Sequence, residues 1–435
     1  MKRKLHQRLA VLAILACLVL ISACGSGGTD PSVSSSAAVD QEECILVGRV
    51  VPITGPLASF GSGTPFVEQQ AIDYINDVLG GIYMSDLGRK LPIRLVHADS
   101  ESSLTKASEA AVRLIQEEFI DIMVVSNTAD TVCPVSTVCE RYGIPCISVD
   151  APADVWLAGG PYTYSFHAFF NTENELNCFM DAWDQLASNK QVGLVAPDDL
   201  EGLEIATRLP EMAIGRGYNV VDPGRFAVGA KNYGQLIRQL KGSGCQIIAG
   251  VMNAPDFAVF WRQCAELNYQ PKISTIAKAN LFAEDVAALG RLGDGLITEV
   301  WWAPDFPGIS SLTGWNGKEL ADKYQVATNL ENVPATIGYK HANIELLYDI
   351  LSRAASVEAE KVVAAIRETE LETLVGLIRF DAQNICIMPC LTGQWSVTDD
   401  GRAELKIVAN TQKPDVTVNG PVRRHFPSAS TLSGD

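Results

Sequence analysis

The feature that most constrains the fold is a regular alternation of short apolar runs and longer amphipathic stretches over residues 44–302. Cys44–Val51 and Ile120–Val125 are nearly continuous apolar runs, typical of strands buried on both faces. Between such runs lie segments with apolar residues three and four positions apart, for example Leu104–Glu117. Because parallel strands need a crossover connection, this alternation predicts parallel sheets with helices on both faces.

The expected elements form two series, one before and one after residue 190. The expected strands are Cys44–Val51, Leu91–His97, Ile120–Val125, Ile144–Val149, Tyr162–His167, Gln191–Ala196, Tyr218–Val221, Cys245–Val251, Lys272–Ile276, Leu296–Trp302, Leu374–Phe380, Cys390–Ser396 and Glu404–Val408. The expected helices are Pro65–Leu79, Leu104–Glu117, Val132–Tyr142, Glu173–Ala187, Gly202–Arg216, Tyr233–Gly242, Pro255–Asn268, Leu281–Gly290, Trp315–Tyr324, Pro334–Ser352 and Val357–Thr369. The two series and the chain length predict two α/β lobes of similar architecture.

The first 24 residues have the organisation of a secretory signal. Basic residues precede an apolar run over Leu9–Leu20, and Ile21-Ser22-Ala23-Cys24 follows it. The run is shorter than the roughly 20 apolar residues of a membrane-spanning helix. The last four residues resemble a bacterial lipobox; the alternative is an ordinary signal peptide with a chance cysteine. We expect a lipoprotein signal peptide over residues 1–23, lipidation at Cys24, and a flexible, Gly- and Ser-rich tether over residues 24–43.

Charge excludes two classes of partner. Removal of residues 1–23 takes four of the 34 Lys and Arg residues and none of the 51 Asp and Glu residues, which leaves a net charge of −21. Such a charge argues against binding to nucleic acid and against adsorption to anionic lipid.

The cysteines give no sign of a metal site. Nine remain after the signal and the lipidated residue, so at least one thiol is free or pairs between chains. Cys386 and Cys390 are close enough in sequence to bridge, and so are Cys133 and Cys139. No pair has zinc-ligand spacing, and we expect no metal and no cofactor.

Several segments, in their order and spacing, resemble type I periplasmic binding proteins. Val50–Gly61 (VVPITGPLASFG) resembles the opening of that family, and in particular of its leucine/isoleucine/valine-binding branch, which serves ABC importers. Further similar segments are Ile72–Asp77 with Gly80-Gly81-Ile82, Tyr142–Pro145, Pro197–Gly202 and His341–Ser352. The resemblance covers residues 44 to about 410.

The resemblance implies two doubly wound parallel-sheet lobes joined by three hinge crossings, near residues 168, 301 and 380, that close on a ligand. Lobe one would comprise residues 44–168 and 302–379, lobe two residues 169–301 and 380–410, and residues 411–435 would form a flexible tail. It also implies an exported, lipid-anchored, monomeric solute-binding component of an ABC importer, at the outer face of the cytoplasmic membrane or in the periplasm. Its partners would be a small-molecule ligand and the permease and ATPase subunits.

Ligands of open α/β sheets bind beyond the carboxyl ends of the strands, and the resemblance selects the same loops. In lobe one it implies contacts from Phe60, from Thr128 and Ala129, and from Asp150 and Ala151. Amino-acid binders of the family hold the ligand carboxylate there with hydroxyls and helix N-terminal N–H groups, but Asp150 would repel a carboxylate. The alternative roles are simple packing for Phe60 and helix capping for Asp150.

Lobe two, the hinge and one helix of lobe one supply the other implied contacts, which are Asp199, Leu200, Asn253, Lys278, Trp301 and His341. Lys278 stands near where amino-acid binders place an acid for the ligand ammonium, and a lysine only donates hydrogen bonds. We therefore expect a ligand with an acid or acceptor group near Lys278 and with aromatic walls from Phe60 and a tryptophan. The expected ligand is a small polar or aromatic organic solute: an aromatic or other organic acid, an amide-like solute or an amino acid. The alternative role for Lys278 is a solvated surface lysine.

An enzyme and a sensor are the competing functions. The chain has no Gly-x-Ser-x-Gly, His-Glu-x-x-His or Gly-x-x-x-x-Gly-Lys motif, and its five histidines are far from one another in sequence, so we expect no catalysis. A sensor would usually carry a membrane helix and a cytoplasmic domain. A binding lipoprotein that feeds a separate sensor remains the alternative to transport.

Overall fold

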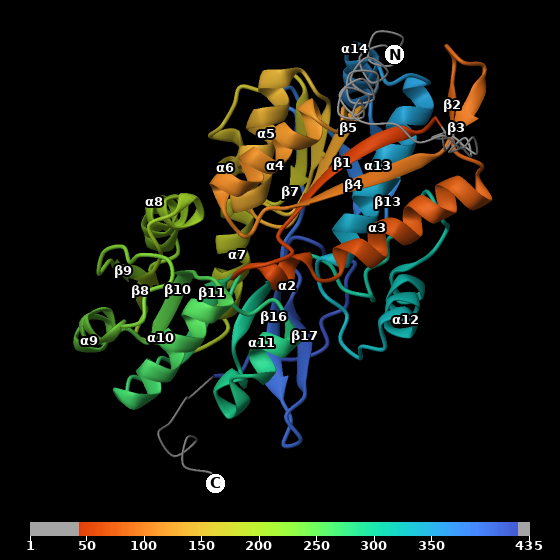
Figure 1. Ribbon diagram of the computed structural model, residues 1–435. Helices are drawn as coiled ribbons and strands as arrows, with labels where there is room; N and C mark the ends of the chain where they lie inside the picture. The colour runs from red at the N-terminus through yellow and green to blue at the C-terminus, as the bar shows by residue number, and fades with distance from the viewer. Residues whose placement is uncertain (1–42, 425–435) are drawn as a thin grey trace, which may run out of the picture.

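Two separate sheets organise the chain in the computed structural model, which describes residues 43–424 (Figure 1). Helices cover both faces of each sheet, as the alternation of strands and helices predicts (Figure 1). The expected signal peptide, Cys24, the tether up to residue 42 and residues 425–435 of the expected tail lie outside the described residues.

Lobe one is built on a six-stranded sheet in which all strands run parallel. In spatial order these strands are β15 (Ile385–Ile387), β7 (Ser165–Phe169), β6 (Cys146–Ser148), β5 (Ile122–Val125), β1 (Ile45–Val51) and β4 (Ile93–Asp99). Every residue of β1 is buried, because its side chains alternate between two covered faces. Val47 joins the core under α3 (Thr64–Asp73) and α13 (Ile337–Ala354), and Leu46 joins the core under α4 (Leu104–Gln116) and α5 (Ala129–Tyr142).

Lobe two is built on a seven-stranded sheet. In spatial order its strands are β17 (Ala403–Ala409), β16 (Leu391–Val397), β12 (Ile297–Val300), β11 (Ile273–Ala277), β10 (Ile247–Val251), β8 (Gln191–Val195) and β9 (Asn219–Val221). β16 and β17 are antiparallel to their neighbours, and the other five strands are parallel. Helices α7 (Thr172–Trp183) and α8 (Leu200–Gly215) pack on one face, and α9 (Gly234–Gly242) and α10 (Ala254–Glu266) pack on the other.

Shorter elements complete the lobes. They are α2 (Ala58–Gly61), a π-helical turn (Tyr74–Val78), β2 (Ile82–Met84), β3 (Arg89–Leu91), α6 (Ala153–Leu157), α11 (Ala283–Ala287), a 3-10 turn (Gly290–Gly293), α12 (Gly317–Thr328), α14 (Ala359–Arg367), β13 (Glu370–Thr373) and β14 (Gly376–Arg379). Several of them, including α2, β2, α6 and β13, are not among the expected elements. The strand expected over Leu374–Phe380 is present only in part, as β14, and the structure adds β13 before it. Leu374 and Val375 instead form the turn of the β13–β14 hairpin, and Gly376 adopts a φ of +116°, which suits glycine.

The chain crosses between the lobes three times, and the third crossing lies later than expected. The first crossing joins β7 to α7, and the second follows β12. The third was expected near residue 380, with residues 380–410 in lobe two. However, β15 still pairs with β7 in lobe one, through Ile385 and His167, and the chain enters lobe two at β16. A three-residue strand after a polar turn gives too short an apolar run to be recognised from sequence.

Residues 411–424 pack on lobe two, although the sequence predicts a flexible tail from residue 411. Asn419 N donates to Ile407 O at 2.9 Å, and Arg423 pairs with Asp294 at 2.6 Å. These contacts extend lobe two beyond β17.

None of the described helices is both long and apolar enough to cross a bilayer. All nine described cysteines are free thiols in the structure, including Cys133, Cys139, Cys386 and Cys390.

Candidate functional site

The carboxyl ends of the parallel strands in both sheets meet between the lobes. From lobe one come Phe60 in α2 and Thr128 after β5; from lobe two come Glu201 at the start of α8 and Lys278 after β11. All four are at least nine-tenths buried. Because Lys278 and Glu201 both contact residues of α5, we define this junction as the interlobe cleft.

An ion-pair cluster closes the cleft around Lys278. Its Nζ lies 3.2 Å from Asp130 Oδ2 of lobe one and 3.2 Å from Glu201 Oε1 of lobe two. Burial lowers the pKa of Lys278, but Glu201, Asp130 and Asp199 raise it, and the net shift is upward. Burial raises the pKa of Glu201 to about 7, against the opposing effect of Lys278. Lys278 is therefore a buried, charged bridge between the lobes, and not the solvated surface lysine considered as its alternative.

Further carboxyl groups lie behind Lys278. Glu299 of β12 accepts the Lys278 backbone N–H at 2.9 Å, and burial raises the pKa of Glu299 to about 7. Burial, with added repulsion from Glu299, also raises the pKa of Glu175 in α7 well above its usual range. The surroundings of Lys278 thus hold a surplus of acidic groups, which disfavours a ligand carboxylate at this position.

The N-terminus of α5 presents a hydroxyl and an N–H group to the cleft. Thr128 is the N-cap residue, yet its side chain makes no capping hydrogen bond. Its Oγ1 is buried and has no hydrogen-bond partner among the described residues. The Ala129 N–H donates to Glu201 Oε1 at 3.4 Å. Helix N-termini attract negative groups, so Glu201 of lobe two occupies a position that suits an anion.

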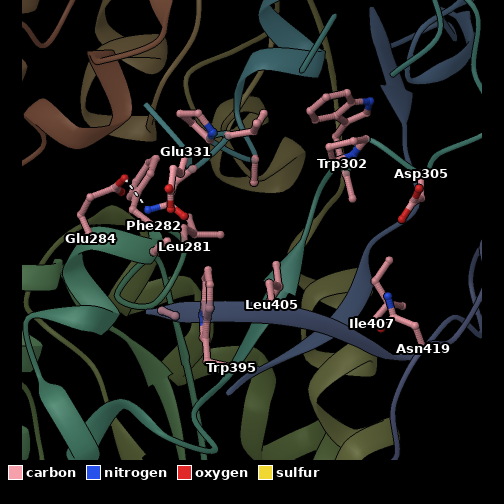
Figure 2. Close-up of a pocket in the computed structure, with 18 residues that line it drawn as sticks. Leu281, Phe282, Glu284, Trp302, Asp305, Glu331, Trp395, Leu405, Ile407 and Asn419 are labelled. Carbon is pink, nitrogen blue, oxygen red and sulfur yellow. Dashed lines mark hydrogen bonds between the residues drawn. The ribbon is translucent and has the colours of Figure 1, made fainter. Parts of the chain in front are cut away.

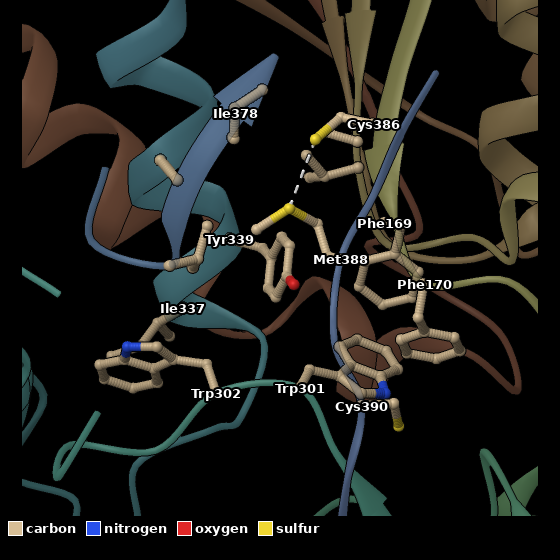
Figure 3. Packing of buried hydrophobic residues seen from close by; sticks show 14 of the residues in the cluster. Phe169, Phe170, Trp301, Trp302, Ile337, Tyr339, Ile378, Cys386, Met388 and Cys390 are labelled. Atoms are coloured by element: carbon tan, nitrogen blue, oxygen red, sulfur yellow. Dashed lines mark hydrogen bonds between the residues drawn. The ribbon is translucent and has the colours of Figure 1, made fainter. Parts of the chain in front are cut away.

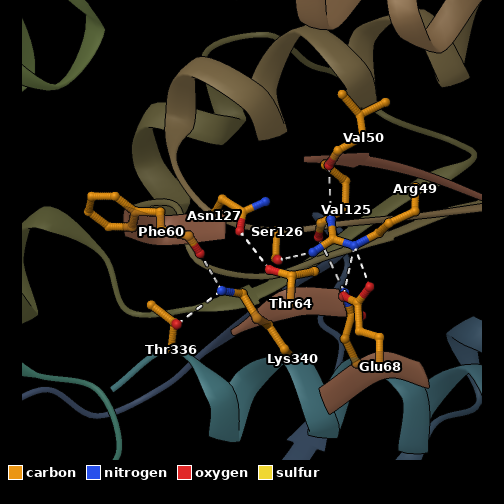
Figure 4. Close-up of polar contacts among 11 residues, drawn as sticks. Arg49, Val50, Phe60, Thr64, Glu68, Val125, Ser126, Asn127, Thr336 and Lys340 are labelled. Carbon is orange, nitrogen blue, oxygen red and sulfur yellow. Dashed lines mark hydrogen bonds and ion pairs between the residues drawn. The ribbon is translucent and has the colours of Figure 1, made fainter. Parts of the chain in front are cut away.

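A buried charge network supports these loops from within lobe one (Figure 4). Arg49 Nε donates to both carboxylate oxygens of Glu68, at 2.7 and 2.8 Å, and both side chains are fully buried. The Arg49 guanidinium also donates to Ser126 Oγ, two residues before the α5 N-cap. Lys340 Nζ donates to the backbone carbonyl of Phe60 (Figure 4). The network therefore holds the loop after β5 and the α2 turn in place.

Asp150 takes part in this internal network. Its carboxylate oxygens are buried and receive no hydrogen bond of normal geometry from the described residues. Burial raises the pKa of Asp150 to about 7, while Lys340 and Arg49 lower it. Burial lowers the pKa of Lys340 to about 8, while Asp150 raises it. The charges of Asp150 and Lys340 are therefore coupled inside lobe one, while the hydrogen bonds of Lys340 go to Phe60 O and Thr336 Oγ1.

Aromatic rings line the cleft beside the hinge. Phe60 contacts Phe282 of lobe two edge to face, with ring centroids 4.9 Å apart, and lies 6.1 Å from Trp301. Trp301 packs edge to face on Phe169, at 4.9 Å. Figure 3 shows Trp301 and Trp302 pointing to opposite sides of the chain, as successive residues of an extended segment do. Trp301 therefore belongs to the cleft side.

A separate cavity lies on the side of Trp302 (Figure 2). It has a volume of about 240 Å³ and is lined by both lobes. Phe282, Trp302 and Trp395 form aromatic walls, and Glu284 and Glu331 lie among its lining residues. Phe282 lines this cavity and also contacts Phe60. Within residues 43–424, no group of three His, Cys, Asp or Glu side chains is arranged to hold a metal ion.

The expected contact residues divide into two groups. Phe60, Thr128, Ala129, Lys278 and Trp301 lie at the interlobe junction. The other expected residues have contacts or exposure of a different kind. Asp150 and Ala151 are buried in lobe one, and His341 bonds to Ser310 at 2.8 Å. In lobe two, Asp199 caps α8 by accepting from Gly202 N at 2.8 Å, Leu200 is 41% exposed, and Asn253 is the half-buried N-cap of α10.

His341 does not reach the cleft. Its Nε2 shares a hydrogen bond with Ser310, and its ring lies 6.1 Å from that of Trp315, within lobe one. The preceding residue, Lys340, faces Phe60 instead. A one-residue step turns a helical side chain by about 100°, so a small error in helix register changes the expected contact.

Sequence reasoning missed Glu201, Phe282 and Lys340 as residues of this region. Glu201 lies within the segment Pro197–Gly202 that carries the family resemblance, two residues after the N-cap Asp199. The position of Glu201 in the sequence indicates a place in the cleft, because the first turn of a helix that follows a parallel strand lies at the carboxyl edge of the sheet. Phe282 and Lys340 carry no comparable signal.

The chain matches the family model described as periplasmic binding protein over residues 45–401. It is 23% identical over 346 residues to the Leu/Ile/Val-binding protein BraC3 of Rhizobium johnstonii, covering 77% of this chain and 87% of that protein. A leucine binding protein LivK of Thermotoga maritima shares the fold with a TM-score of 0.71 and 17% identity, over 85% of this chain and 99% of that chain. The fold is also similar to that of a solute binding protein of an ABC transporter from Rhodopseudomonas palustris, solved in complex with 3,4-dihydroxy benzoic acid. The TM-score is 0.66 and the identity 15%, over 88% of this chain and 98% of that chain.

Proposed function

Because this chain belongs to the periplasmic binding protein family, it is an extracytoplasmic solute-binding protein rather than an enzyme, and we propose that it binds a small polar organic solute in the interlobe cleft for an ABC importer. The observation that carries this proposal is the buried, unpartnered Thr128 hydroxyl at the N-terminus of α5, opposite Lys278 and Glu201. A buried hydroxyl without a partner costs free energy, which a bound solute would recover.

The chemistry of the cleft favours a solute with both an acceptor group and a donor group. The hydroxyl and N–H groups of Thr128 and Ala129 suit an acceptor, such as a carboxylate or an amide oxygen. The carboxyl groups around Lys278 suit an ammonium or amide donor. Phe60 and Trp301 provide apolar walls. Amino acids and amide-like solutes fit this set. An organic acid fits only with its carboxylate at α5, because two carboxylates already neutralise Lys278.

Two charged groups of lobe two, the Glu201 carboxylate and the Lys278 ammonium, already contact lobe one. Glu201 approaches the α5 N-terminus, and Lys278 pairs with Asp130. A solute that carries the same two groups would compete with these side chains or extend their network. Closure of the lobes therefore depends on both the solute and the chain's own charges.

The proposal also includes a membrane anchor and partner subunits. Cys24 would carry a lipid anchor, and the anchored monomer would deliver its solute to the permease and ATPase subunits. Labelling with a radioactive fatty acid tests the anchor, since substitution of Cys24 with serine should abolish incorporation.

A thermal-shift screen of the full chain tests the binding function. Amino acids, amides and organic acids are added singly, and a true ligand at 100 times its Kd should stabilise the protein by about 2.7 kcal/mol. Thr128→Val should lose that shift, because the substitution removes the hydroxyl and keeps the shape. Thr137→Val is the matched control, since Thr137 lies on the exposed side of the same helix and bonds to its own helix at Cys133 O. An unaltered shift in Thr128→Val would contradict this placement of the ligand.

A further inference from the structure

Two buried thiols lie side by side where the chain passes between the lobes. Cys178 belongs to α7, which follows the first crossing, and Cys390 directly precedes β16, which follows the third crossing. Their sulfur atoms are 3.7 Å apart, and each residue is 1% exposed. Figure 3 shows Cys390 beside Trp301 and Phe170 at the hinge.

The backbones around the two thiols are already held together. Thr392 Oγ1 donates to the carbonyl oxygen of Cys178. Gln412 joins the same two segments, because its Oε1 accepts the Cys390 N–H at 3.0 Å and its Nε2 donates to Asn174 O at 2.7 Å. A disulfide has an S–S bond of about 2.05 Å, so the sulfur atoms would have to approach by about 1.7 Å. Rotation of the two side chains can provide part of that approach while the flanking hydrogen bonds hold the backbones.

We propose that Cys178 and Cys390 form a disulfide in the exported protein, which ties the first hinge crossing to the third. The two thiols lose two protons and two electrons as the S–S bond forms. A disulfide-containing oxidant of the extracytoplasmic space accepts them and is reduced to a dithiol. Burial raises the pKa of both thiols. Since the thiolate is the reactive form, the bond would form before the hinge is fully packed.

This pairing differs from the one suggested by sequence spacing. Cys386 and Cys390 are four positions apart, but the Cys386 sulfur contacts Met388 Sδ at 3.6 Å and the carbonyl oxygen of Leu377 at 3.9 Å. It belongs to the β15 side of the third crossing, in lobe one. Cys386 is therefore the matched control, as a buried thiol near the same crossing.

Peptide mapping of the full chain, exported into an oxidising compartment and alkylated under denaturing conditions, tests the proposal. We expect a linked peptide that contains Cys178 and Cys390 and disappears on reduction. Complete alkylation of both residues before reduction, or a Cys386–Cys390 link, would overturn the proposal. As a second readout, reduction should lower the Tm of the wild type by about 5 °C. Cys178→Ala should lose this redox dependence and Cys386→Ala should keep it; equal redox dependence in Cys178→Ala and wild type would also overturn the proposal.

Discussion

Lys278 of lobe two and Asp130 of lobe one form an ion pair across the interlobe cleft, with Nζ 3.2 Å from Oδ2. Asp130 lies in the first turn of α5, and Glu201, the second partner of Lys278, approaches the same helix end from lobe two. The lobes are therefore joined by charges of the chain itself. If the solute binds in the interlobe cleft as we propose, it would lie among these charges, and their balance would contribute to its selection.

Replacement of Lys278 by methionine should open the lobes. The variant leaves the carboxyl groups of Asp130 and Glu201 without their buried cation, and loss of one partner of a buried pair typically costs about 3 kcal/mol. We expect a lower free energy of unfolding and a larger radius of gyration in small-angle X-ray scattering. Lys318→Met is the control, because its ion pair with Asp305 is exposed and such pairs contribute about 0–1 kcal/mol. Unchanged scattering for Lys278→Met would show that the pair does not hold the lobes together.

Glu201 should make stability depend on pH near neutrality. Burial raises its pKa to about 7, above the value of about 4.3 in an unfolded chain. Between these values the folded protein holds a proton that the unfolded chain has lost, so this contribution to stability is present at low pH and is lost as the pH rises towards 7.

The comparison of Glu201→Gln with wild type isolates this effect from the other buried groups. Between pH 5 and pH 8 the wild type should lose more unfolding free energy, measured by urea denaturation, than the variant. Glu211→Gln, an exposed substitution on the same helix, should behave like the wild type. The same pH dependence in Glu201→Gln and wild type would exclude Glu201 as the titrating group.

The edge-to-face contact of Phe60 and Phe282 should couple the lobes. The rings belong to different lobes, and such pairs contribute about 0.5–1.5 kcal/mol beyond the area they bury. A double-mutant cycle of Phe60→Ala and Phe282→Ala should give a coupling energy in that range. Phe66→Ala is a suitable comparison, because Phe66 packs on Tyr324 within lobe one; it should lower stability without changing the radius of gyration. A coupling energy near zero would argue against the cross-lobe contact.

Asp150 should be coupled electrostatically to Lys340. Each group shifts the pKa of the other inside lobe one. Lys340→Met should therefore destabilise the fold by about 2–3 kcal/mol, because it removes a buried cation that donates to Phe60 O. Addition of Asp150→Asn should recover part of that loss, since it removes the unpaired charge.

The same substitution tests whether Asp150 contacts the ligand, as the family resemblance implies. On the wild-type background, Asp150→Asn should change the affinity for the screened solute by less than about threefold, which corresponds to about 0.6 kcal/mol. A tenfold or larger loss in calorimetry, at unchanged stability, would place the carboxylate in contact with the ligand.

The alternation of strands and helices was sufficient to predict the two-lobed fold. β1 and β10 are buried on both faces, and such strands read as continuous apolar runs. β15 was missed because three residues give no periodicity, and this omission moved the expected third crossing. The strand expected over Leu374–Phe380 includes the turn residues Leu374 and Val375 because they are apolar and buried, and it omits β13.

The site was predicted less completely, because its chemistry depends on contacts between lobes. The loops of Thr128 and Lys278 follow from the rule that ligands bind at the carboxyl ends of parallel strands. No local pattern indicates that Lys278 meets Asp130, 148 positions away in the sequence. The sequence also gives no sign that His341 bonds to Ser310 within lobe one, or that the preceding Lys340 donates to Phe60 O.

Hydrogen–deuterium exchange with and without the solute identified by the screen tests most directly whether it binds between the lobes. We predict slower exchange in peptides from both lobes, over residues 58–61 and 126–132 in lobe one and residues 199–205 and 277–282 in lobe two. Protection confined to one lobe, or centred on residues 331–335 and 403–407 around the cavity beside Trp302, would contradict binding in the interlobe cleft.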